Sequence, residues 1–256
     1  MDIQPASNVL KGRVALVTAS ARGIGRACAL ALAQAGADII LGLREKSSGL
    51  ELAEQIRGMG RQALPVQMDV SRMDEIQSAV AEGHAYFKHI DILVNNAGIG
   101  AANPAEKVSE RDFDETLAVN LKGTFFTCQA VGKIMIAQRD GRIINIGSQA
   151  GSVALPTESV YCMTKAAISH LTKCLALEWA PYRVNVNAVA PTFIETPGTK
   201  KWLDDPAFRQ SVIERIPLGH IGDPADVAGP VVFLASPGAA LITGATLMID
   251  GGWTLA

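Results

Sequence analysis

The chain has 256 residues, with 23 Lys and Arg against 25 Asp and Glu, so its formal net charge is −2. So small a charge provides no field that would gather nucleic acid or anionic lipid, and we expect neither as a partner. The composition is 48% hydrophobic and 19% charged, which excludes a disordered chain and is typical of a globular protein with a full core.

The distribution of apolar and metal-binding residues disfavours two further classes. The longest stretch without a charged residue, 227–249, could span a membrane by length alone, but Pro230, Pro237 and several glycines interrupt it. No basic segment followed by an apolar one stands at the N-terminus, so we expect no secretory signal and a cytoplasmic protein. The four cysteines and four histidines lack metal-ligand spacing, so no metal site is expected.

Short apolar segments alternate along the chain with segments of helical periodicity. Helix starts are indicated by Ser71, Ser109 and Asp223, each followed three residues later by an acid. Buried strands are predicted, from length and β-branched content, at residues 14–18, 38–43, 63–67, 91–94, 142–146, 184–189 and 246–249.

This alternation predicts the fold class. Strands that alternate with helices form a mostly parallel sheet covered on both faces, and right-handed crossovers make it doubly wound. We therefore expect an α/β Rossmann fold with a seven-stranded parallel sheet, as a single domain at 12–256 after an N-terminal arm at 1–11. Ligands of such sheets bind at the carboxyl ends of the strands, so site residues should follow strands directly.

The first predicted strand leads into a glycine-containing loop at 18–25 and then into an Ala-rich helix. Gly23 and Gly25 allow close backbone approach at a helix N-terminus, where free N–H groups and the helix dipole favour a pyrophosphate. This loop resembles the T-G-x-x-x-G-x-G loop of the short-chain dehydrogenase/reductase family. Ala19 replaces the first glycine, and an alanine would be strained there if the turn needs a positive φ.

The end of the second predicted strand bears on the choice of cofactor. Sites that prefer NAD usually place an acid there, whereas a cation accommodates the 2′-phosphate of NADP. Arg44 follows this strand, and Arg22 can reach the same phosphate, as in NADP-preferring members of the family. A charge-assisted contact contributes about 1.5–3 kcal/mol, or roughly ten- to a hundredfold in affinity. We expect NADP(H) to be preferred over NAD(H), unless Arg44 is only a solvated neighbour of Glu45.

The family resemblance implies further cofactor contacts. Asp69 and Val70 resemble the family's adenine-edge contact, and the segment 95–98 resembles its N-N-A-G motif beside the nicotinamide. Ile194 and Thr196 stand where the family holds the nicotinamide carboxamide. The expected cofactor-binding residues are Thr18, Ser20, Arg22, Gly23, Ile24, Gly25, Arg44, Asp69, Val70, Asn96, Ala97, Gly98, Tyr161, Lys165, Ile194 and Thr196.

Tyr161 and Lys165 have a spacing that suits proton transfer. Four residues apart on a helix, they share one face about 6 Å apart along the axis. A tyrosine with a pKa near 10 is only ~0.1% phenolate at neutral pH, and a nearby ammonium is expected to lower that pKa. Asn120, Ser148, Tyr161 and Lys165 match the family's catalytic tetrad. The resemblance implies that Tyr161 is the general acid/base, that Ser148 binds the substrate oxygen, and that Asn120 holds a water linking Lys165 to solvent.

The segment 196–215 stands where the family has its substrate lid. Its cations are Lys200, Lys201, Arg209 and Arg215, mixed with acids. The run is either a solvated helix face or a lid in which one cation turns inward to hold a carboxylate. The expected substrate-binding residues are Ser148, Gln149, Glu158, Tyr161 and Thr192, of which Thr192 replaces a family glycine.

Together these motifs predict an NAD(P)-dependent oxidoreductase that acts on a carbonyl or secondary alcohol of a sugar, sugar acid or small ketone. The pattern resembles the gluconate 5-dehydrogenase-like members of the family. Two alternatives are a 3-oxoacyl-carrier-protein reductase and a dinucleotide-sensing scaffold, although such scaffolds typically lack the catalytic Tyr or Lys. Family members form homotetramers through helices equivalent to 109–138 and 157–180, and we expect the same here.

Overall fold

The computed structural model describes residues 8–255, so most of the expected N-terminal arm lies outside the described residues. Its seven-stranded sheet has the order β3-β2-β1-β4-β5-β6-β7, and every neighbouring pair is parallel. The strands are β1 (Val14–Thr18), β2 (Asp38–Leu43), β3 (Ala63–Gln67), β4 (Ile92–Asn95), β5 (Gly141–Ile146), β6 (Val184–Pro191) and β7 (Thr246–Ile249). The prediction of a doubly wound Rossmann fold is confirmed.

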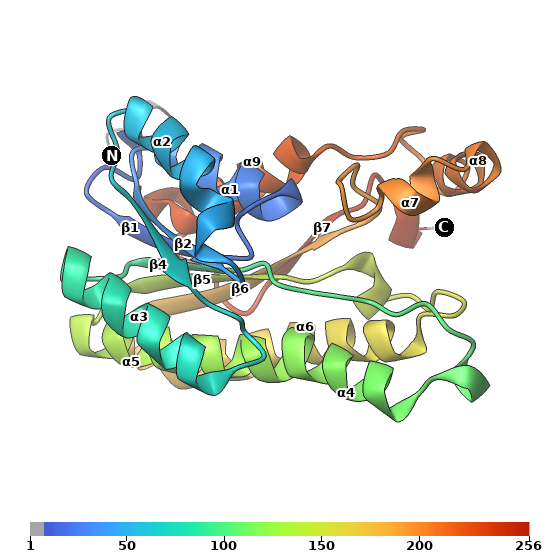
Figure 1. The fold of residues 1–256 in the computed structure, drawn as a ribbon, viewed down its shortest axis with the longest axis horizontal. Helices are drawn as coiled ribbons and strands as arrows, with labels where there is room; N and C mark the ends of the chain where they lie inside the picture. Colours follow the sequence, from blue (N-terminus) through green and yellow to red (C-terminus); the bar gives the residue numbers. More distant parts are fainter. Residues whose placement is uncertain (1–7, 256) are drawn as a thin grey trace.

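Helices cover both faces of the sheet (Figure 1). One face carries α1 (Gly23–Gln34), α2 (Leu50–Gly58) and α9 (Pro224–Ala235), and the other carries α3 (Met73–Phe87), α5 (Thr124–Gln138) and α6 (Ser159–Trp179). Strand β1 divides its side chains between the two layers: Ala15 and Val17 join one buried apolar cluster, and Val14 and Leu16 join the other. Burial on both faces explains why this strand is a continuous apolar run.

Two of the predicted helix starts are correct because their side chains cap the free N–H groups of a first turn. The Ser109 hydroxyl accepts a hydrogen bond from the Asp112 N–H at the start of α4 (Glu110–Leu117). At the start of α9, the Asp223 and Asp226 side chains form a reciprocal capping box.

Two other predicted starts need correction. Ser71 does not cap α3, which begins at Met73, because the Ser71 hydroxyl donates instead to the Asp69 carboxylate at 2.7 Å. Helix α1 begins at Gly23, inside the segment 18–25 that was predicted to be a loop before the helix. The glycine loop therefore forms the first turn of α1 itself, which brings the helix N-terminus closer to the strand end.

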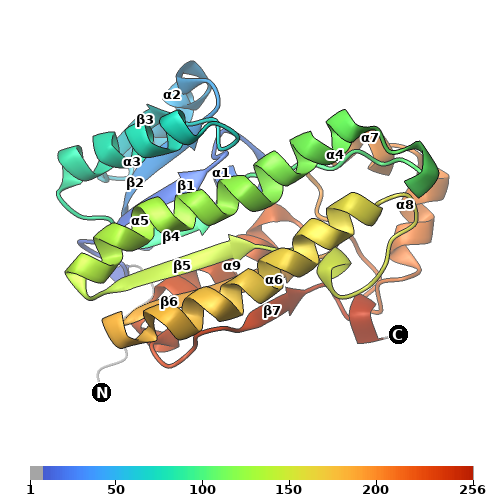
Figure 2. The ribbon, with the colours of Figure 1, turned by 90° about the horizontal axis from the view of Figure 1, so that it is seen from below.

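Helices α4 and α5 are joined without a break by a π-helical segment, Ala118–Gly123, that contains the buried Asn120. Figure 2 shows α4 continuing from α5 toward α7 (Lys200–Leu203) and α8 (Pro206–Ile213). The π-helical turn shifts the helix face at the point where Asn120 must point inward, and such turns are frequent at functional sites. No helix within residues 8–255 is long and apolar enough to cross a membrane.

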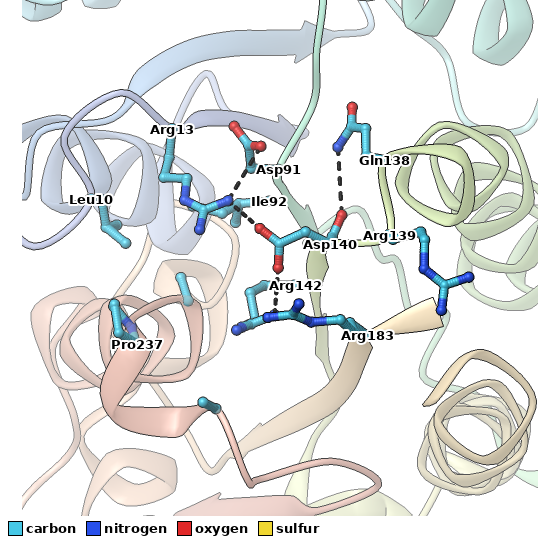
Figure 3. Close-up of a pocket in the computed structure, with 12 residues that line it drawn as sticks. Leu10, Arg13, Asp91, Ile92, Gln138, Arg139, Asp140, Arg142, Arg183 and Pro237 are labelled. Carbon is cyan, nitrogen blue, oxygen red and sulfur yellow. Dashed lines mark hydrogen bonds and ion pairs between the residues drawn. The ribbon is translucent and has the colours of Figure 1, made fainter. Parts of the chain in front are cut away.

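A cavity of about 500 Å³ lies at the amino-terminal edge of the sheet (Figure 3). Arg13 donates to the carboxylates of Asp91 and Asp140, and Arg142 donates to Asp140 at 3.4 Å. These ion pairs join the chain at the starts of β1, β4 and β5. Because both carboxylates are already paired with arginines of neighbouring strands, we interpret this cluster as a structural network.

Candidate active site

A larger cleft, of about 1640 Å³, lies at the carboxyl ends of β1, β4, β5 and β6. The strand order reverses between β1 and β4, and ligands of doubly wound sheets bind at such a switch point. Sites for single small molecules measure roughly 300–1,000 Å³, so this cleft has room for a dinucleotide together with a substrate.

Most of the predicted site residues meet in this cleft. The ones that line it are Arg22, Gly23, Ile24, Arg44, Asp69, Val70, Asn96, Ala97, Gly98, Ser148, Gln149, Glu158, Tyr161, Lys165, Thr192, Ile194 and Thr196. The remaining four, Thr18, Ser20, Gly25 and Asn120, are buried behind the lining.

The glycine loop keeps a left-handed turn although its first glycine is replaced. Ala19 has a φ of 51°, in the region that favours glycine, so the strain expected from the sequence is present. Gly25 has no room for a side chain, because a Cβ there would lie 2.4 Å from Asn96 Nδ2 and 2.5 Å from the Ala19 carbonyl oxygen. Close packing of three chain segments therefore requires this glycine.

Asn96 and Thr18 lock the loop after β4 to the glycine loop. The Thr18 hydroxyl oxygen accepts hydrogen bonds from the backbone N–H groups of Asn96 and Ala97 at 2.9 and 3.1 Å. In return, Asn96 Nδ2 donates to the carbonyl oxygens of Thr18 and Ala19 at 3.1 and 3.2 Å. The two loops that form this part of the cleft are thus held as one unit.

The N-terminus of α1 fits the pyrophosphate of a dinucleotide. Within residues 8–255, no side chain caps this helix and no acid stands in its first turn. The N–H groups of Gly23, Ile24 and Gly25 are those that an α-helix leaves without a partner inside the helix. With Gly23 and Ile24 lining the cleft, the helix end presents free donors and a positive dipole to an anion.

Two guanidinium groups near this helix end fit the 2′-phosphate of NADP. Arg22 and Arg44 are exposed, line the cleft and form no ion pair with a carboxylate within residues 8–255. Nearby Lys46, by contrast, pairs with Glu82 at 3.1 Å. The two arginines therefore offer unneutralised positive charge where the prediction placed it.

Where the adenine contact is expected, the Asp69 carboxylate accepts hydrogen bonds from the Ser71 N–H and hydroxyl at 2.9 and 2.7 Å. Val70 packs against the π-helical segment, because a Cβ on Gly123 would lie 2.6 Å from the Val70 carbonyl oxygen. This close contact fixes the wall of the cleft between β3 and the α4–α5 helix.

Tyr161 lies in the first turn of α6, beside Ser148 at the end of β5. Burial raises the pKa of Tyr161 to about 12, although hydrogen bonding with Ser148 acts in the opposite direction. The expectation of a lowered Tyr161 pKa is therefore wrong for this structure, because burial is the largest influence on the phenol and the negative charge of Glu158 adds to it. At neutral pH the phenol keeps its proton and can donate it.

Lys165 is buried, and its ammonium lies 5.5 Å from the centre of the Tyr161 ring. One N–H group donates to the Ile146 carbonyl oxygen at 2.8 Å, which fixes the head group at the end of β5. Burial lowers the pKa of Lys165 to about 8, so the ammonium form still prevails at neutral pH. Its other N–H donors can serve a ligand in the cleft that Lys165 lines.

Asn120 holds the loop after β4 rather than standing free. Its Oδ1 accepts from the Ile99 N–H at 2.8 Å, and its Nδ2 donates to the Ile99 carbonyl at 2.8 Å and to the Thr164 hydroxyl at 3.0 Å. Both amide hydrogens are therefore engaged. The expected water between Asn120 and Lys165 stays a prediction, for which only Oδ1 retains an acceptor site.

Two of the four lid cations are neutralised on the surface. Lys200 pairs with Asp204 at 2.9 Å, and Arg209 forms two hydrogen bonds with the Glu195 carboxylate at 3.1 and 3.2 Å. For these two residues, the expectation of a solvated helix face is correct.

The other two cations line the cleft. Lys201 lies over the Trp202 ring at 4.0 Å, and Arg215 over the Trp253 ring at 4.3 Å. The acid four residues after Lys201 is Asp205, but its carboxylate caps α8 by accepting from the N–H groups of the following turn. Lys201 therefore has no carboxylate partner within the described part of the chain, and neither does Arg215.

Thr192, which replaces a family glycine, does not adopt a positive φ. Its N–H donates to the Ile249 carbonyl at 3.1 Å, and its hydroxyl is buried without a hydrogen-bond partner in residues 8–255. The residue lines the cleft, but its hydroxyl oxygen is covered by the surrounding chain, so the expected substrate contact stays a prediction.

Several residues of the site escaped the sequence analysis. Asn145 on β5 accepts from Asn95 Nδ2 at 2.9 Å and donates to the Thr172 hydroxyl at 3.0 Å, which ties the two central strands to α6. The signal was a polar side chain within an otherwise apolar predicted strand. Trp253, which was not among the expected site residues, also lines the cleft.

Two of the four cysteines contribute to the packed core. Cys28 and Cys128 are buried, and burial raises the pKa of each thiol to about 12, which suppresses reactivity. All four cysteines are free thiols. Residues 8–255 contain no group of three or more His, Cys, Asp or Glu side chains that could hold a metal ion.

Comparisons with known proteins agree with this site. A family model described as "Enoyl-(Acyl carrier protein) reductase" matches residues 18–254. An NAD-dependent glycerol dehydrogenase of Listeria innocua is 41% identical over 244 residues, which cover 95% of this chain and 94% of that protein. A 3-oxoacyl-[acyl-carrier-protein] reductase of Thermotoga maritima is 40% identical over 243 residues, or 95% and 98% of the two chains.

A comparison with a solved structure shows that the similarity extends to the fold. A gluconate 5-dehydrogenase from Burkholderia cenocepacia, crystallised in complex with NADP and tartrate, has a TM-score of 0.94 and 38% sequence identity, covering 98% of this chain and 99% of that chain. The chain therefore belongs to the short-chain dehydrogenase/reductase family. It is an oxidoreductase that acts on CH–OH groups.

Proposed function

We propose that this protein is an NADP-preferring oxidoreductase that interconverts a carbonyl and a secondary alcohol on a sugar, sugar acid or small ketone. The observation that carries the proposal is that one cleft is lined both by Tyr161 and Lys165 and by an uncapped helix end with two unpaired arginines, Arg22 and Arg44. Tyr161 and Lys165 suit proton transfer to a carbonyl oxygen. The helix end and the two arginines suit a phosphorylated dinucleotide.

The proposed roles of the side chains follow from their protonation. The bound nicotinamide supplies the hydride for reduction or accepts it in oxidation. Tyr161, protonated at neutral pH, donates its proton to the carbonyl oxygen as the carbinol forms, and Ser148 holds that oxygen by a hydrogen bond. The Lys165 ammonium stabilises the phenolate that remains. In oxidation, the same phenolate takes the proton back.

The polar lining of the substrate end supports a hydroxylated substrate. Gln149, Glu158 and Thr192 line this end, and Glu158 is only partly buried. Arg215, stacked on Trp253, is the cation best placed to hold the carboxylate of a sugar acid. The gluconate 5-dehydrogenase crystallised with NADP supports both the cofactor and the substrate class, whereas the NAD-dependent glycerol dehydrogenase supports only the substrate class.

The alternative of a 3-oxoacyl-carrier-protein reductase is supported by the matching family description and by the Thermotoga relative. Such an enzyme needs a largely apolar path for the acyl chain. The charged Glu158, Lys201 and Arg215 in the cleft favour the hydroxylated substrate instead. A scaffold without activity is disfavoured because Tyr161 and Lys165 are both present.

A homotetramer and a cytoplasmic location remain parts of the proposal. Exposed apolar side chains on the long helices, namely Phe113, Phe125, Met163 and Leu177, support self-association through this layer. Leu175 and Ala176 do not contribute, because they are buried in the core. Light scattering coupled to size-exclusion chromatography measures the assembly directly.

The replacement Tyr161→Phe tests the proposed reaction. It removes the proton donor but keeps the ring, so kcat should fall by roughly a hundredfold or more while the affinity for NADPH stays within about twofold. Unchanged turnover on the best carbonyl substrate would refute the assigned mechanism.

A further inference from the structure

Glu158 is an unpartnered carboxylate at the mouth of the catalytic helix. It occupies the N-cap position of α6, with φ −114° and ψ 25°, but its side chain does not cap the helix. Within residues 8–255 its carboxylate forms no hydrogen bond or ion pair, and the residue lines the cleft while partly buried. Its carboxylate oxygens are thus free to accept a hydrogen bond from a ligand in the cleft.

The carboxylate lies beside Tyr161. The position that a Cβ on Gly100 would take is 3.3 Å from Glu158 Oε2 and 3.3 Å from Tyr161 Cδ2, so both flank the same small space. Gly100, in the loop after β4, keeps this space open. The effect of Glu158 on its surroundings is electrostatic as well, because its negative charge contributes to raising the pKa of Tyr161.

Lys201 provides the opposite charge from the lid. Burial raises the pKa of Glu158, and the positive charge of Lys201 lowers it, so the two side chains are near enough to interact. They form no ion pair within 4.0 Å, however, and both line the cleft. A donor and an acceptor thus face the same cleft from two elements, α6 and α7, with a gap between them.

We propose that Glu158 and Lys201 together bind a hydroxyl group close to the reacting carbonyl, so that the enzyme selects polyhydroxylated ketones and polyols over plain ketones. A hydroxyl can donate to the Glu158 carboxylate and accept from the Lys201 ammonium at the same time, which an alkyl group cannot. This inference rests on the proposed oxidoreductase function and names the substrate class of the same site.

Erythrulose and 2-butanone form a matched pair for the test. Both have four carbons and a carbonyl at the second carbon, and they differ only in their hydroxyl groups. The measurement is the ratio of kcat/KM for erythrulose to that for 2-butanone, with NADPH, in the wild type and in Glu158→Gln, Lys201→Met and the double variant. Lys200→Met is the matched control, because the adjacent Lys200 is paired with Asp204 on the surface.

The wild type should favour erythrulose. Glu158→Gln and Lys201→Met should each reduce the ratio by about ten- to a hundredfold, mainly by raising KM for erythrulose, because each removes a charge-assisted hydrogen bond. In the double variant, the ratio should fall by less than the product of the two single reductions, because both residues bind the same hydroxyl group. Lys200→Met should keep the wild-type ratio within about twofold.

Three results would overturn the inference. A wild-type enzyme that reduces 2-butanone as efficiently as erythrulose refutes the selection for hydroxyls but leaves the oxidoreductase proposal standing. Equal losses on both ketones in Glu158→Gln assign Glu158 a structural role instead. A wild type that reduces neither these ketones nor any other carbonyl with NADPH overturns the proposed function and this inference with it.

Discussion

Asn120 and Ile99 are joined by two hydrogen bonds, one from the Ile99 N–H to Asn120 Oδ1 and one from Asn120 Nδ2 to the Ile99 carbonyl oxygen, each 2.8 Å long. This pairing imitates one step of a β-ladder between a side chain and the backbone. It connects the π-helical turn of the α4–α5 helix to the loop that follows β4, and so adds a second anchor to the one that Asn96 forms with Thr18.

Asn120→Ala should destabilise the fold by about 2–4 kcal/mol, because it removes all three hydrogen bonds of a buried side chain, two to the Ile99 backbone and one to the Thr164 hydroxyl. Urea denaturation measures the free energy of unfolding. Asn103→Ala is the control, since the Asn103 side chain forms no hydrogen bond within the described residues. A loss below about 0.5 kcal/mol for Asn120→Ala would show that the loop does not depend on this anchor.

Ala19→Gly should stabilise the protein by about 0.5–1 kcal/mol. The left-handed conformation costs an L-residue roughly 1–2 kcal/mol, and relief of this strain exceeds the entropy that glycine adds to the unfolded chain. Ala21→Gly, two residues along the same loop at an ordinary φ, should instead destabilise it. Equal destabilisation by both glycines, measured in the same denaturation experiment, would contradict the assigned strain.

Arg44→Met should weaken NADPH binding by about ten- to a hundredfold and leave NADH binding within about twofold, because only NADPH carries the 2′-phosphate. Fluorescence titration of the reduced cofactors gives both dissociation constants. Lys46→Met serves as the control, since Lys46 is paired with Glu82. Equal weakening of NADPH and NADH binding would mean that Arg44 stabilises the loop and does not contact the 2′-phosphate.

Lys165 should impose a distinctive pH dependence on stability. Its pKa is about 8 in the folded state, lowered by burial from 10.5, so between these values the unfolded chain binds more protons than the folded one. The contribution of Lys165 to the free energy of unfolding therefore rises with pH between about 8 and 10.5 and is constant at lower pH. The unfolding free energy of the wild type minus that of Lys165→Met should therefore increase by roughly 3 kcal/mol from pH 8 to 10.5. A flat or falling difference would contradict the burial of a charged lysine.

The sequence was sufficient for the fold because the strands and the motifs that follow them are local patterns. Every predicted strand is present, and the glycine loop and Ser148 follow strand ends as expected. The pKa of Tyr161 could not be predicted in this way, since it depends on how much water the folded chain excludes around the phenol.

The lid shows a second limit. Lys200 and Lys201 are adjacent, and each has an aspartate four residues later. Only Lys200 forms its ion pair, because Asp205 caps α8 and is lost to Lys201. The spacing of charges alone does not reveal this competition between helix capping and pairing, so the sequence left open which cation faces the cleft.

The central claim is that this cleft binds NADPH through Arg22 and Arg44 and reduces hydroxylated carbonyl compounds with Tyr161 as the proton donor. The most direct measurement is the initial rate of NADPH and NADH oxidation by the purified protein with sugar-acid ketones, erythrulose, simple ketones and an acetoacetyl thioester, with Tyr161→Phe as the blank. The account predicts at least tenfold higher kcat/KM with NADPH, a hydroxylated ketone as the best substrate, and no rate above background in the blank. Preference for the thioester, or full activity in Tyr161→Phe, would contradict it.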